Sequence, residues 1–368
     1  MPYGILAADQ IQSSVTGVSL GAGNATRFKN RIINGYMVID QRTAGASSTP
    51  TTDGTYTSID RWGSGLSQSS KFSVQQNAGS VTPPVGFSSY LGVTSLAATS
   101  LGATDYFLQY QKIEGFNFAD LGWGTANAKT ITLSFWVRSS LTGTFGGSLS
   151  NSAQSRNYPF SYTINSANTW EYETITIPGD TTGTWIGATN GTGLLLRFSL
   201  GVGSTYSGTA NAWTGSSFIF QPTSSVSVVG TNGATWYVTG VQVEVGSIAT
   251  GFEEVDYTTQ LAMCQRYFTK SYDMGSAVPT VNTSVGSAAY YSTNGNAFYN
   301  NPFKVTMRTT PTVTTYSYQG TSGKIGGASN AELTATVYQQ GTAGFNVYAV
   351  GNGSAGDFYC NYGASAEL

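Results

Sequence analysis

The sequence contains few side chains that could carry out catalysis. It has no histidine, which removes the Ser-His-Asp and Cys-His machinery of nucleophilic enzymes. The same absence removes the residue that most often binds zinc. No glycine-rich stretch ends in the Gly-Lys-Ser/Thr that a phosphate-binding loop requires. The remaining candidates for chemistry are carboxylates and aromatic rings.

Two pairs of glutamates could form a glycosidase site, in which two carboxyl groups flank the scissile bond. They are Glu171 with Glu173, and Glu253 with Glu254. Residues two apart on an exposed strand face are usually solvated charges that deter aggregation. Neighbours in an extended chain point to opposite faces, so Glu253 and Glu254 cannot share one substrate. We therefore expect no catalytic residues, and a polysaccharide depolymerase is the least favoured function.

The thiols and aspartates do not form a metal-binding pattern. The two cysteines, Cys264 and Cys360, lie far apart in the sequence, and we interpret them as structural thiols. Asp105, Asp120 and Asp180 are isolated, and no calcium-loop motif occurs. The sequence therefore assigns no metal site.

Three aromatic residues are candidates for binding a ligand. Trp185, Tyr206 and Trp213 lie in segments rich in Gly, Ser and Thr rather than in alternating strands. A ring in a loop can stack on the face of a sugar while nearby Asn and Thr side chains bond its hydroxyls. These three residues are our candidates for carbohydrate binding. The alternative is that each ring plugs an end of the protein core.

Composition restricts the fold class and the partners. Charged residues make up 9% of the chain, and 16 basic against 18 acidic side chains give a net charge of -2. No basic field exists to hold nucleic acid or an anionic membrane surface. No run of about 18 apolar residues occurs, so we expect no membrane insertion. The 46 glycines and 23 tyrosines, with abundant Ser, Thr and Asn, are typical of an all-β protein.

Several segments alternate apolar and polar residues with the period of a half-buried strand. Thr130–Arg138 is the clearest, since Ile131, Leu133, Phe135 and Val137 share one face. The other expected strands are Lys71–Gln75, Asp105–Ile113, Tyr158–Ile164, Trp170–Ile177 and Gly193–Leu200. We expect roughly eight to ten such strands, which fits an antiparallel sandwich.

Charged residues gather at the start of this region. They are Arg31, Asp40, Arg42, Asp60 and Arg61. We interpret them as a structural set of ion pairs, because nothing else chemical accompanies them.

The hydrophobic period changes within Trp236–Phe268. Val241, Val243 and Val245 alternate with Gln242 and Glu244, which predicts a last strand with one buried and one solvent-facing side. Leu261, Cys264, Tyr267 and Phe268 then recur at helical spacing behind Asp256, a candidate N-cap. We therefore predict a helix from Tyr257 to Phe268. Its apolar residues are our candidate for contact between subunits.

This part of the sequence resembles a known family. TGVQVEVGSIATGFE followed by YTTQLAMCQRYF is similar to the closing strand and following helix of tail-fibre-like structural proteins of bacteriophages. Relatives often have proline where this chain has Gly251. KNRIINGYMVIDQR, SIDRW, SFWVR, TWEYETITIPGD and GLLLRFSLGVGS resemble the carbohydrate-binding-module-like jelly roll of these proteins, and FKVTMRTTPTV, GFNVYAVGNG and GASAEL resemble their C-terminal domain.

Pattern and resemblance together predict an all-β fold: an antiparallel jelly-roll sandwich with an N-terminal extended arm, a short connecting helix and a small C-terminal β domain. The expected divisions are an attachment arm over 1–28, the jelly roll over 29–255, the helix and linker over 256–275, and the C-terminal domain over 276–368. The arm could instead be a flexible leader.

The resemblance also implies a function. It is that of a non-enzymatic virion protein, a tail fibre or receptor-binding protein that contacts host surface glycans. The alternative is a capsid or tail decoration protein without glycan binding. The implied partners are other virion proteins, reached through the arm, and further copies of the chain, three preferred. Calcium stays open as a cofactor because jelly rolls of this kind often hold one, and the implied location is the virion.

Overall fold

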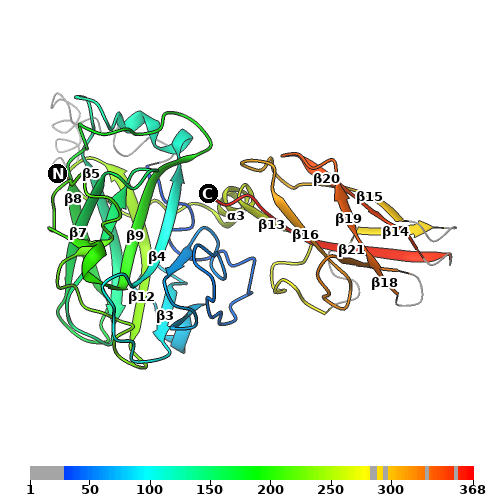
Figure 1. The fold of residues 1–368 in the computed structure, drawn as a ribbon, viewed down its shortest axis with the longest axis horizontal. Coiled ribbons are helices and arrows are strands. Elements are labelled where there is room, and N and C mark those ends of the chain that lie inside the picture. The colour runs from blue at the N-terminus through cyan, green and yellow to red at the C-terminus, as the bar shows by residue number, and fades with distance from the viewer. Residues whose placement is uncertain (1–28, 282–287, 293–296, 328–330, 352–354) are drawn as a thin grey trace, which may run out of the picture.

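The computed structural model describes residues 29–281, 288–292, 297–327, 331–351 and 355–368. The predicted arm over 1–28 lies outside these residues. The described chain forms two β bodies that meet at the short helix α3 (Tyr257–Gln265), as Figure 1 shows. We call the body that contains β1 to β12 the sandwich, and the one that contains β13 to β21 the C-terminal body.

The sandwich consists of two five-stranded sheets. The first has the order β1 (Gly63–Leu66), β4 (Tyr106–Glu114), β9 (Thr192–Val202), β6 (Gly143–Ser150), β7 (Asn157–Ile164). The second has the order β2 (Phe72–Gln76), β3 (Leu91–Ser95), β12 (Thr235–Val245), β5 (Ile131–Ser139), β8 (Glu171–Ile177). Every pairing within the two sheets is antiparallel, so the predicted antiparallel jelly-roll sandwich is confirmed.

Short elements join these strands. They are the 3-10 turns η1 (Ala78–Ser80), η2 (Gly115–Asn117), η3 (Ala119–Leu121) and η4 (Ser204–Tyr206), and the two-residue strands β10 (Ser207–Gly208) and β11 (Gln221–Pro222). β10 and β11 pair with each other in parallel and lie beside the first sheet. They carry the chain across that sheet's outer surface.

The core lies between the two sheets. The predicted inward residues of β5, Ile131, Leu133, Phe135 and Val137, are all fully buried. Phe135 packs edge-on against Phe198 of the facing sheet, with ring centroids 5.0 Å apart. The period of two in the sequence therefore indicated the core-facing side of this strand correctly, but Thr132 and Ser134 on the other side are buried as well.

Strand β6 was absent from the sequence prediction because its sequence, GTFGGSLS, is rich in glycine. The structure shows why glycine is required there. A Cβ atom on Gly147 would lie 2.1 Å from the Arg197 carbonyl oxygen and 2.5 Å from the Phe160 ring. Glycine has a low propensity for strands, but no larger residue fits between this backbone and this ring.

The predicted solvent-facing side of β12 is buried instead. Gln242 is 0% exposed and Glu244 is 2% exposed. Glu244 accepts hydrogen bonds from the backbone N–H and the hydroxyl of Thr250, at 2.8 and 2.6 Å. The expectation of an exposed polar face was wrong, because the chain folds back over it and the polar side chains bond the returning backbone.

Helix α3 begins as predicted and ends early. The Asp256 carboxylate accepts a hydrogen bond from the backbone N–H of Thr259 at 3.0 Å, which confirms the N-cap. Phe268, expected in the helix, instead starts β13 (Phe268–Lys270), because its backbone pairs with Ser365. Among the described residues, every helix is too short or too polar to span a lipid bilayer.

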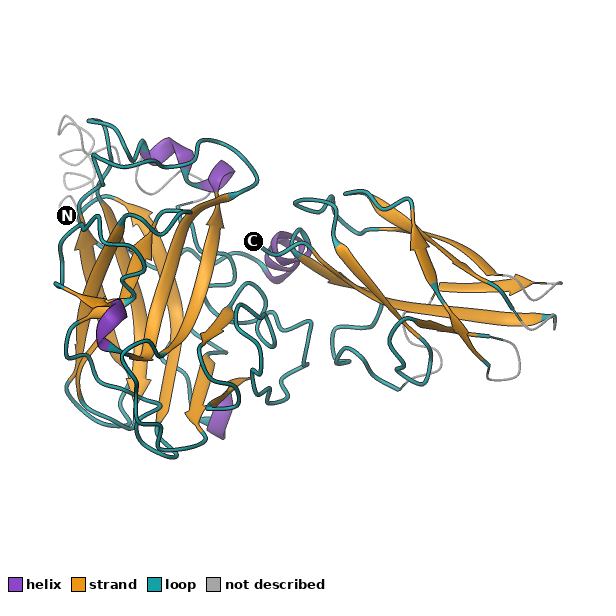
Figure 2. Cartoon of the chain, in the orientation of Figure 1, coloured by secondary structure: helices purple, strands orange, loops and turns teal. Residues whose placement is uncertain are grey.

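The C-terminal body is built around β21 (Gly356–Ser365), which pairs with β13, β14 (Ala288–Ser292), β16 (Thr312–Tyr316) and β17 (Lys324–Gly326). The other strands are β15 (Ala297–Pro302), β18 (Glu332–Thr334), β19 (Thr336–Tyr338) and β20 (Gly344–Ala349). Figure 2 shows this body as strands and loops. The segment 303–311 is a loop whose Phe303 and Met307 are buried.

Buried charges join the two bodies. Arg42 of the sandwich contacts both Asp60 and Glu367 at 3.0 Å. Arg61, with 1% of its side chain exposed, pairs with Glu367 and lies over the Tyr267 ring with its guanidinium carbon 3.5 Å from the centroid. We call these residues the junction network.

The expected ion-pair set therefore exists only in part. Arg42 pairs with Asp60 as predicted. Arg31 pairs with Asp120, and Arg61 reaches Glu367 from the far end of the chain. Asp40 accepts hydrogen bonds from the backbone N–H groups of nearby residues. The sequence did not indicate Asp120 and Glu367 as partners, because they are far from Arg31 and Arg61 along the chain and come close to them only in the folded protein.

A second ion pair extends the junction. Glu114 at the end of β4 accepts hydrogen bonds from Arg266 at 2.6 and 3.0 Å and from the Tyr267 hydroxyl at 2.6 Å. Arg308 then donates to the carbonyl oxygens of Asn190 and Ala366, each at 2.7 Å. These bonds connect sandwich strands to the helix and to the end of the chain.

Changing Glu367 to Gln tests the junction network. The variant leaves buried Arg61 without a carboxylate, and breaking a buried ion pair of this kind costs about 3 kcal/mol. We expect the free energy of unfolding to fall by that amount in chemical denaturation. Glu254→Gln, at an exposed glutamate, is the control. Equal stability of both variants would contradict the role given to Glu367.

Candidate functional site

The structure separates the three predicted carbohydrate-binding residues. Trp185 and Trp213 gather around Trp123 at one end of the sandwich, with edge-to-face ring centroids 4.9 and 5.2 Å from the Trp123 ring. The indole N–H of Trp213 donates to the Pro178 carbonyl at 2.8 Å. That of Trp185 donates to the Thr182 carbonyl at 3.2 Å. This packing fits the alternative interpretation of a core plug, and sugar contact by these two rings stays a prediction.

Changing Trp213 to Ala tests the plug. The ring is partly buried against Trp123, Trp185 and Tyr158. Its removal should cost about 2 kcal/mol of unfolding free energy, somewhat less than a fully buried ring. Trp213→Phe should recover most of the loss. The measurement is chemical denaturation, and a change below about 0.5 kcal/mol, as expected of exposed sites, would contradict the plug.

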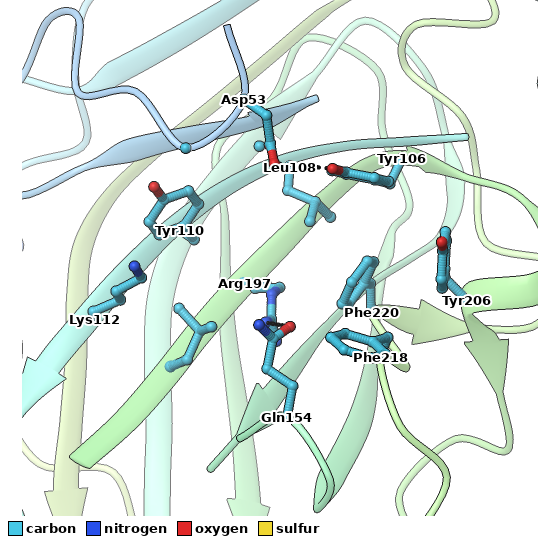
Figure 3. A pocket seen from close by; sticks show the side chains of 13 residues that line it. Asp53, Tyr106, Leu108, Tyr110, Lys112, Gln154, Arg197, Tyr206, Phe218 and Phe220 are labelled. Atoms are coloured by element: carbon cyan, nitrogen blue, oxygen red, sulfur yellow. Dashed lines mark hydrogen bonds between the residues drawn. The ribbon is translucent and has the colours of Figure 1, made fainter. Parts of the chain in front are cut away.

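Tyr206 lies in a different place, a pocket on the outer face of the first sheet (Figure 3). The pocket has a volume of about 360 Å³. Strand β4 contributes alternate residues to its floor, and η4 and the segment just before β11 flank it. The lining residues are Asp53, Gly54, Gly65, Tyr106, Leu108, Tyr110, Lys112, Gln154, Leu195, Arg197, Tyr206, Phe218 and Phe220.

Glycines on strand β1 make room for the pocket. A Cβ atom on Gly63 would lie 2.5 Å from the Tyr110 ring, and one on Gly65 would lie 3.4 Å from Leu108. Tyr110 and Leu108 can therefore lie against bare backbone. β1 adds no side chain on this face that would fill the space above them.

Aromatic rings form one wall. Tyr206 and Phe220 are stacked, with centroids 5.0 Å apart and planes at 29°. Tyr106 meets both rings edge-on, at 5.8 and 5.6 Å. The Tyr106 hydroxyl donates to Asp53 at 2.9 Å. These contacts hold the rings of the wall in fixed orientations.

Phe218 is part of the same wall and is 46% exposed. Its backbone φ of 61° is unusual for a large side chain. The strained conformation is held by a hydrogen bond from the Phe218 N–H to the Gln154 carbonyl at 3.0 Å. Strain of this kind often occurs at binding sites, where it positions a side chain.

Arg197 forms the floor and is only 3% exposed. Its guanidinium donates to the Ser150 hydroxyl at 2.6 Å and to the Gln154 side-chain oxygen, and its central carbon lies 4.7 Å from the Phe220 centroid. In the part of the chain that the structure describes, no carboxylate pairs with it. Burial lowers its pKa to about 9, so the group is still charged at neutral pH.

Lys112 and Asp53 place further charges in the pocket. The Lys112 ammonium donates to the Leu368 carbonyl at 2.6 Å. Burial, and then the charge of Arg197, lower the pKa of Lys112. Asp53 is exposed and accepts from the Leu66 N–H at 2.8 Å. The pocket therefore combines aromatic faces with hydrogen-bonding groups of both signs.

Sequence reasoning did not identify most of this pocket. Tyr106, Tyr110 and Arg197 lie within predicted strands, and the alternation already placed Arg197 on the face opposite to Leu196 and Phe198. The alternation could not predict the register between β4 and β9, which sets Tyr110 opposite Arg197. The feature of the sequence that could have indicated this pocket is Arg197, a charged residue within an otherwise apolar strand.

The paired glutamates lie elsewhere. Glu171 accepts the backbone N–H groups of Asn165 at 2.9 Å and Ser166 at 2.7 Å, so it holds the turn before β8. Burial raises the pKa of Glu173 to about 7, and the charge of Glu171 adds to that effect. Both glutamates are on the edge strand of the second sheet, away from the pocket on the first.

Changing Glu173 to Gln tests this burial through pH. The folded-state pKa of about 7 lies above the ordinary glutamate value of 4.5, so the wild type loses stability as pH rises from about 4.5 through 7. After allowance for solvent screening the loss is about 1 kcal/mol. The variant should lack this decline. Melting temperatures at pH 4.5 and pH 8 measure it, and parallel profiles for the two proteins would contradict the assignment.

No described group of three or more His, Cys, Asp or Glu side chains could hold a metal ion. The isolated aspartates have protein partners: Asp180 binds Arg156 at 2.7 Å, Asp120 binds Arg31 at 2.8 Å, and Asp105 binds Ser67 at 2.8 Å. Calcium binding stays a prediction without an assigned position.

The residues proposed for subunit contact are mostly covered by the chain itself. Cys264 and Tyr267 are 0% exposed and Phe268 is 8% exposed, while Leu261 is partly buried. Cys264 and Tyr267 pack with Ile33 and Ile39 of the sandwich. Both cysteines are free and buried, as structural thiols should be. Contact between subunits through this helix stays a prediction.

No family model and no curated protein sequence matches this chain. Solved structures similar to it include carbohydrate-binding modules. A family 11 module from Clostridium thermocellum, in complex with a beta-1,3-1,4-mixed-linked tetrasaccharide, is 12% identical, with 58% of this chain and 99% of that one covered at a TM-score of 0.28. A CBM4 structure is 16% identical, with 58% and 98% covered at 0.27.

A third similar structure is the N-terminal cellulose-binding domain of Cellulomonas fimi beta-1,4-glucanase C. It is 13% identical, with 55% of this chain and 100% of that domain covered at a TM-score of 0.23. At such identities and TM-scores the likeness has no bearing on what this chain binds. The ligand must therefore be inferred from the residues that line the pocket.

Proposed function

We propose that this chain is a non-enzymatic glycan-binding protein and that the pocket on the first sheet holds a sugar ring. The observation that carries this proposal is the wall of stacked aromatic rings around a cavity of about 360 Å³. A sugar has apolar C–H faces and hydroxyl edges. Aromatic faces with a few fixed polar groups are complementary to both.

The placement of polar groups supports this use. The Gln154 amide, the Lys112 ammonium and the Asp53 carboxylate lie around the cavity, where hydroxyls at the edge of a ring could bond them. Phe218, exposed at the wall, offers a face for stacking. The volume lies within the range of about 300–1,000 Å³ typical of small-molecule sites.

The carboxylate content of the pocket favours binding over hydrolysis. A glycosidase needs two carboxyl groups around the scissile bond. Among the described residues that line this pocket, Asp53 alone carries one. Glu171 and Glu173 lie on the other sheet. A depolymerase is therefore the weaker proposal.

We further propose that the protein acts in a bacteriophage virion as a tail fibre or receptor-binding protein. The resemblance of Trp236–Phe268 and of the jelly-roll segments supports this part. A single sugar contact is weak, roughly millimolar, or about 4 kcal/mol. Linked copies can gain about 10² to 10⁴ in avidity, so a homotrimer anchored through residues 1–28 would make attachment effective.

A decoration protein without glycan binding is the second candidate. The observation in its favour is an aromatic pair on the C-terminal body. Phe298 is 53% exposed and lies opposite Tyr348, with ring centroids 4.7 Å apart. Such a surface could serve cohesion between neighbouring subunits.

Changing Phe218 to Ala tests the proposed function. The wild type should bind a subset of a glycan array when displayed in several copies. The variant should bind those glycans about 5-fold to 30-fold more weakly, because an exposed stacking ring contributes about 1–2 kcal/mol. Isothermal titration with the best array ligand measures the change.

Phe116→Ala is the matched control, since Phe116 is a 57% exposed phenylalanine outside the pocket. It should leave affinity unchanged. If the array shows no glycan binding by the displayed wild type, the glycan-binding proposal fails and the decoration protein takes its place. If Phe116→Ala weakens binding and Phe218→Ala does not, the site is wrongly placed.

A further inference from the structure

Among the residues that the structure describes, the charge at the floor of the pocket has no partner of opposite sign. Arg197 is 3% exposed, and the hydrogen-bond acceptors of its guanidinium are a hydroxyl and an amide oxygen, both neutral. The Phe220 face offsets the charge only in part. A buried cation normally has a carboxylate partner, because removing an isolated charge from water is costly.

The pairing of strands β4 and β9 places these charges beside the pocket. Tyr110 of β4 lies directly opposite Arg197 of β9, and Lys112, two residues further along β4, lies opposite Leu195. A second cation therefore lines the same cavity. Elsewhere in the described chain, the buried arginines Arg42 and Arg61 both pair with Glu367. Arg197 differs from them in facing a cavity instead of a carboxylate.

We propose that the sugar held in this pocket carries one acidic group, a carboxylate or a sulfate ester, which docks on the Arg197 guanidinium. This inference rests on the glycan-binding function proposed above and names its ligand class. The planar guanidinium can bond two oxygens of such an anion at once. The bound anion supplies the counter-charge that no described residue provides at this position.

The negative charge of Asp53 disfavours a second acidic group on the ligand. Its carboxylate is bonded to the Tyr106 hydroxyl and the Leu66 N–H on the pocket wall. A second anion there would be repelled, whereas sugar hydroxyls can donate to it. The pocket therefore favours a ligand with its acid toward Arg197 and its hydroxyls toward Asp53.

The test uses the full chain on an array in which each uronate or sulfated oligosaccharide stands beside its carboxyl-reduced or desulfated counterpart. Acidic glycans should bind about 10-fold to 100-fold more tightly than their neutral counterparts. Arg197→Met should abolish this preference, and Arg197→Lys should keep part of it. The carboxyl-reduced and desulfated arms distinguish the two kinds of acid.

Failure of this inference differs from failure of the proposed function. Equal binding of acidic and neutral glycans, with both weakened by Phe218→Ala, would overturn the acidic ligand and leave the sugar site in place. Retention of the acid preference in Arg197→Met would also overturn it. An array without any bound glycan would remove both proposals.

The free protein provides a readout that does not depend on the ligand. Methionine has a volume similar to that of the arginine stem and removes the unpaired charge, so Arg197→Met should raise the melting temperature by a few degrees. A fall of several degrees would show that the bonds to Ser150 and Gln154 hold the sheet together. That result would overturn the view of Arg197 as a charge kept for a ligand.

Discussion

The buried charges between the two β bodies set the arrangement of the whole molecule. Arg42, Asp60, Arg61 and Glu367 lie almost without solvent contact, where charges are costly unless every partner is in place. Each body supplies only part of the set, so the network is complete only when both are docked. Since Arg61 also donates to the Lys112 carbonyl at 2.6 Å, the same network reaches strand β4 below the pocket.

The sandwich has two aromatic clusters with different surroundings: the tryptophans around Trp123 and the rings of the pocket. In the tryptophan cluster the polar N–H groups donate to carbonyls of the chain, and the rings pack edge-to-face. In the pocket the rings stand around an open volume, and a charged group lies at its base. The difference arises from what surrounds them: the tryptophans close one end of the core, whereas Gly63 and Gly65 keep the space beside Tyr110 and Leu108 clear.

Low charge and a binding role are compatible in this protein. With 9% charged residues, the chain cannot rely on a long-range electrostatic field to attract a partner. It instead places a few charges where solvent is excluded, and there each one has a larger effect. Arg197, Glu244 and Glu367 are all examples, two satisfied by the protein and one facing the cavity.

The sequence by itself determined the fold class, the buried side of strand β5 and the cap of helix α3. These features depend on residues a few positions apart, and their periodicity is visible without a structure. Only the tertiary structure decided that Gln242 and Glu244 are covered, that Glu367 reaches Arg61, and that Tyr110 lies opposite Arg197. Those outcomes depend on strand register and on contacts between distant segments, and local patterns carry no information about either.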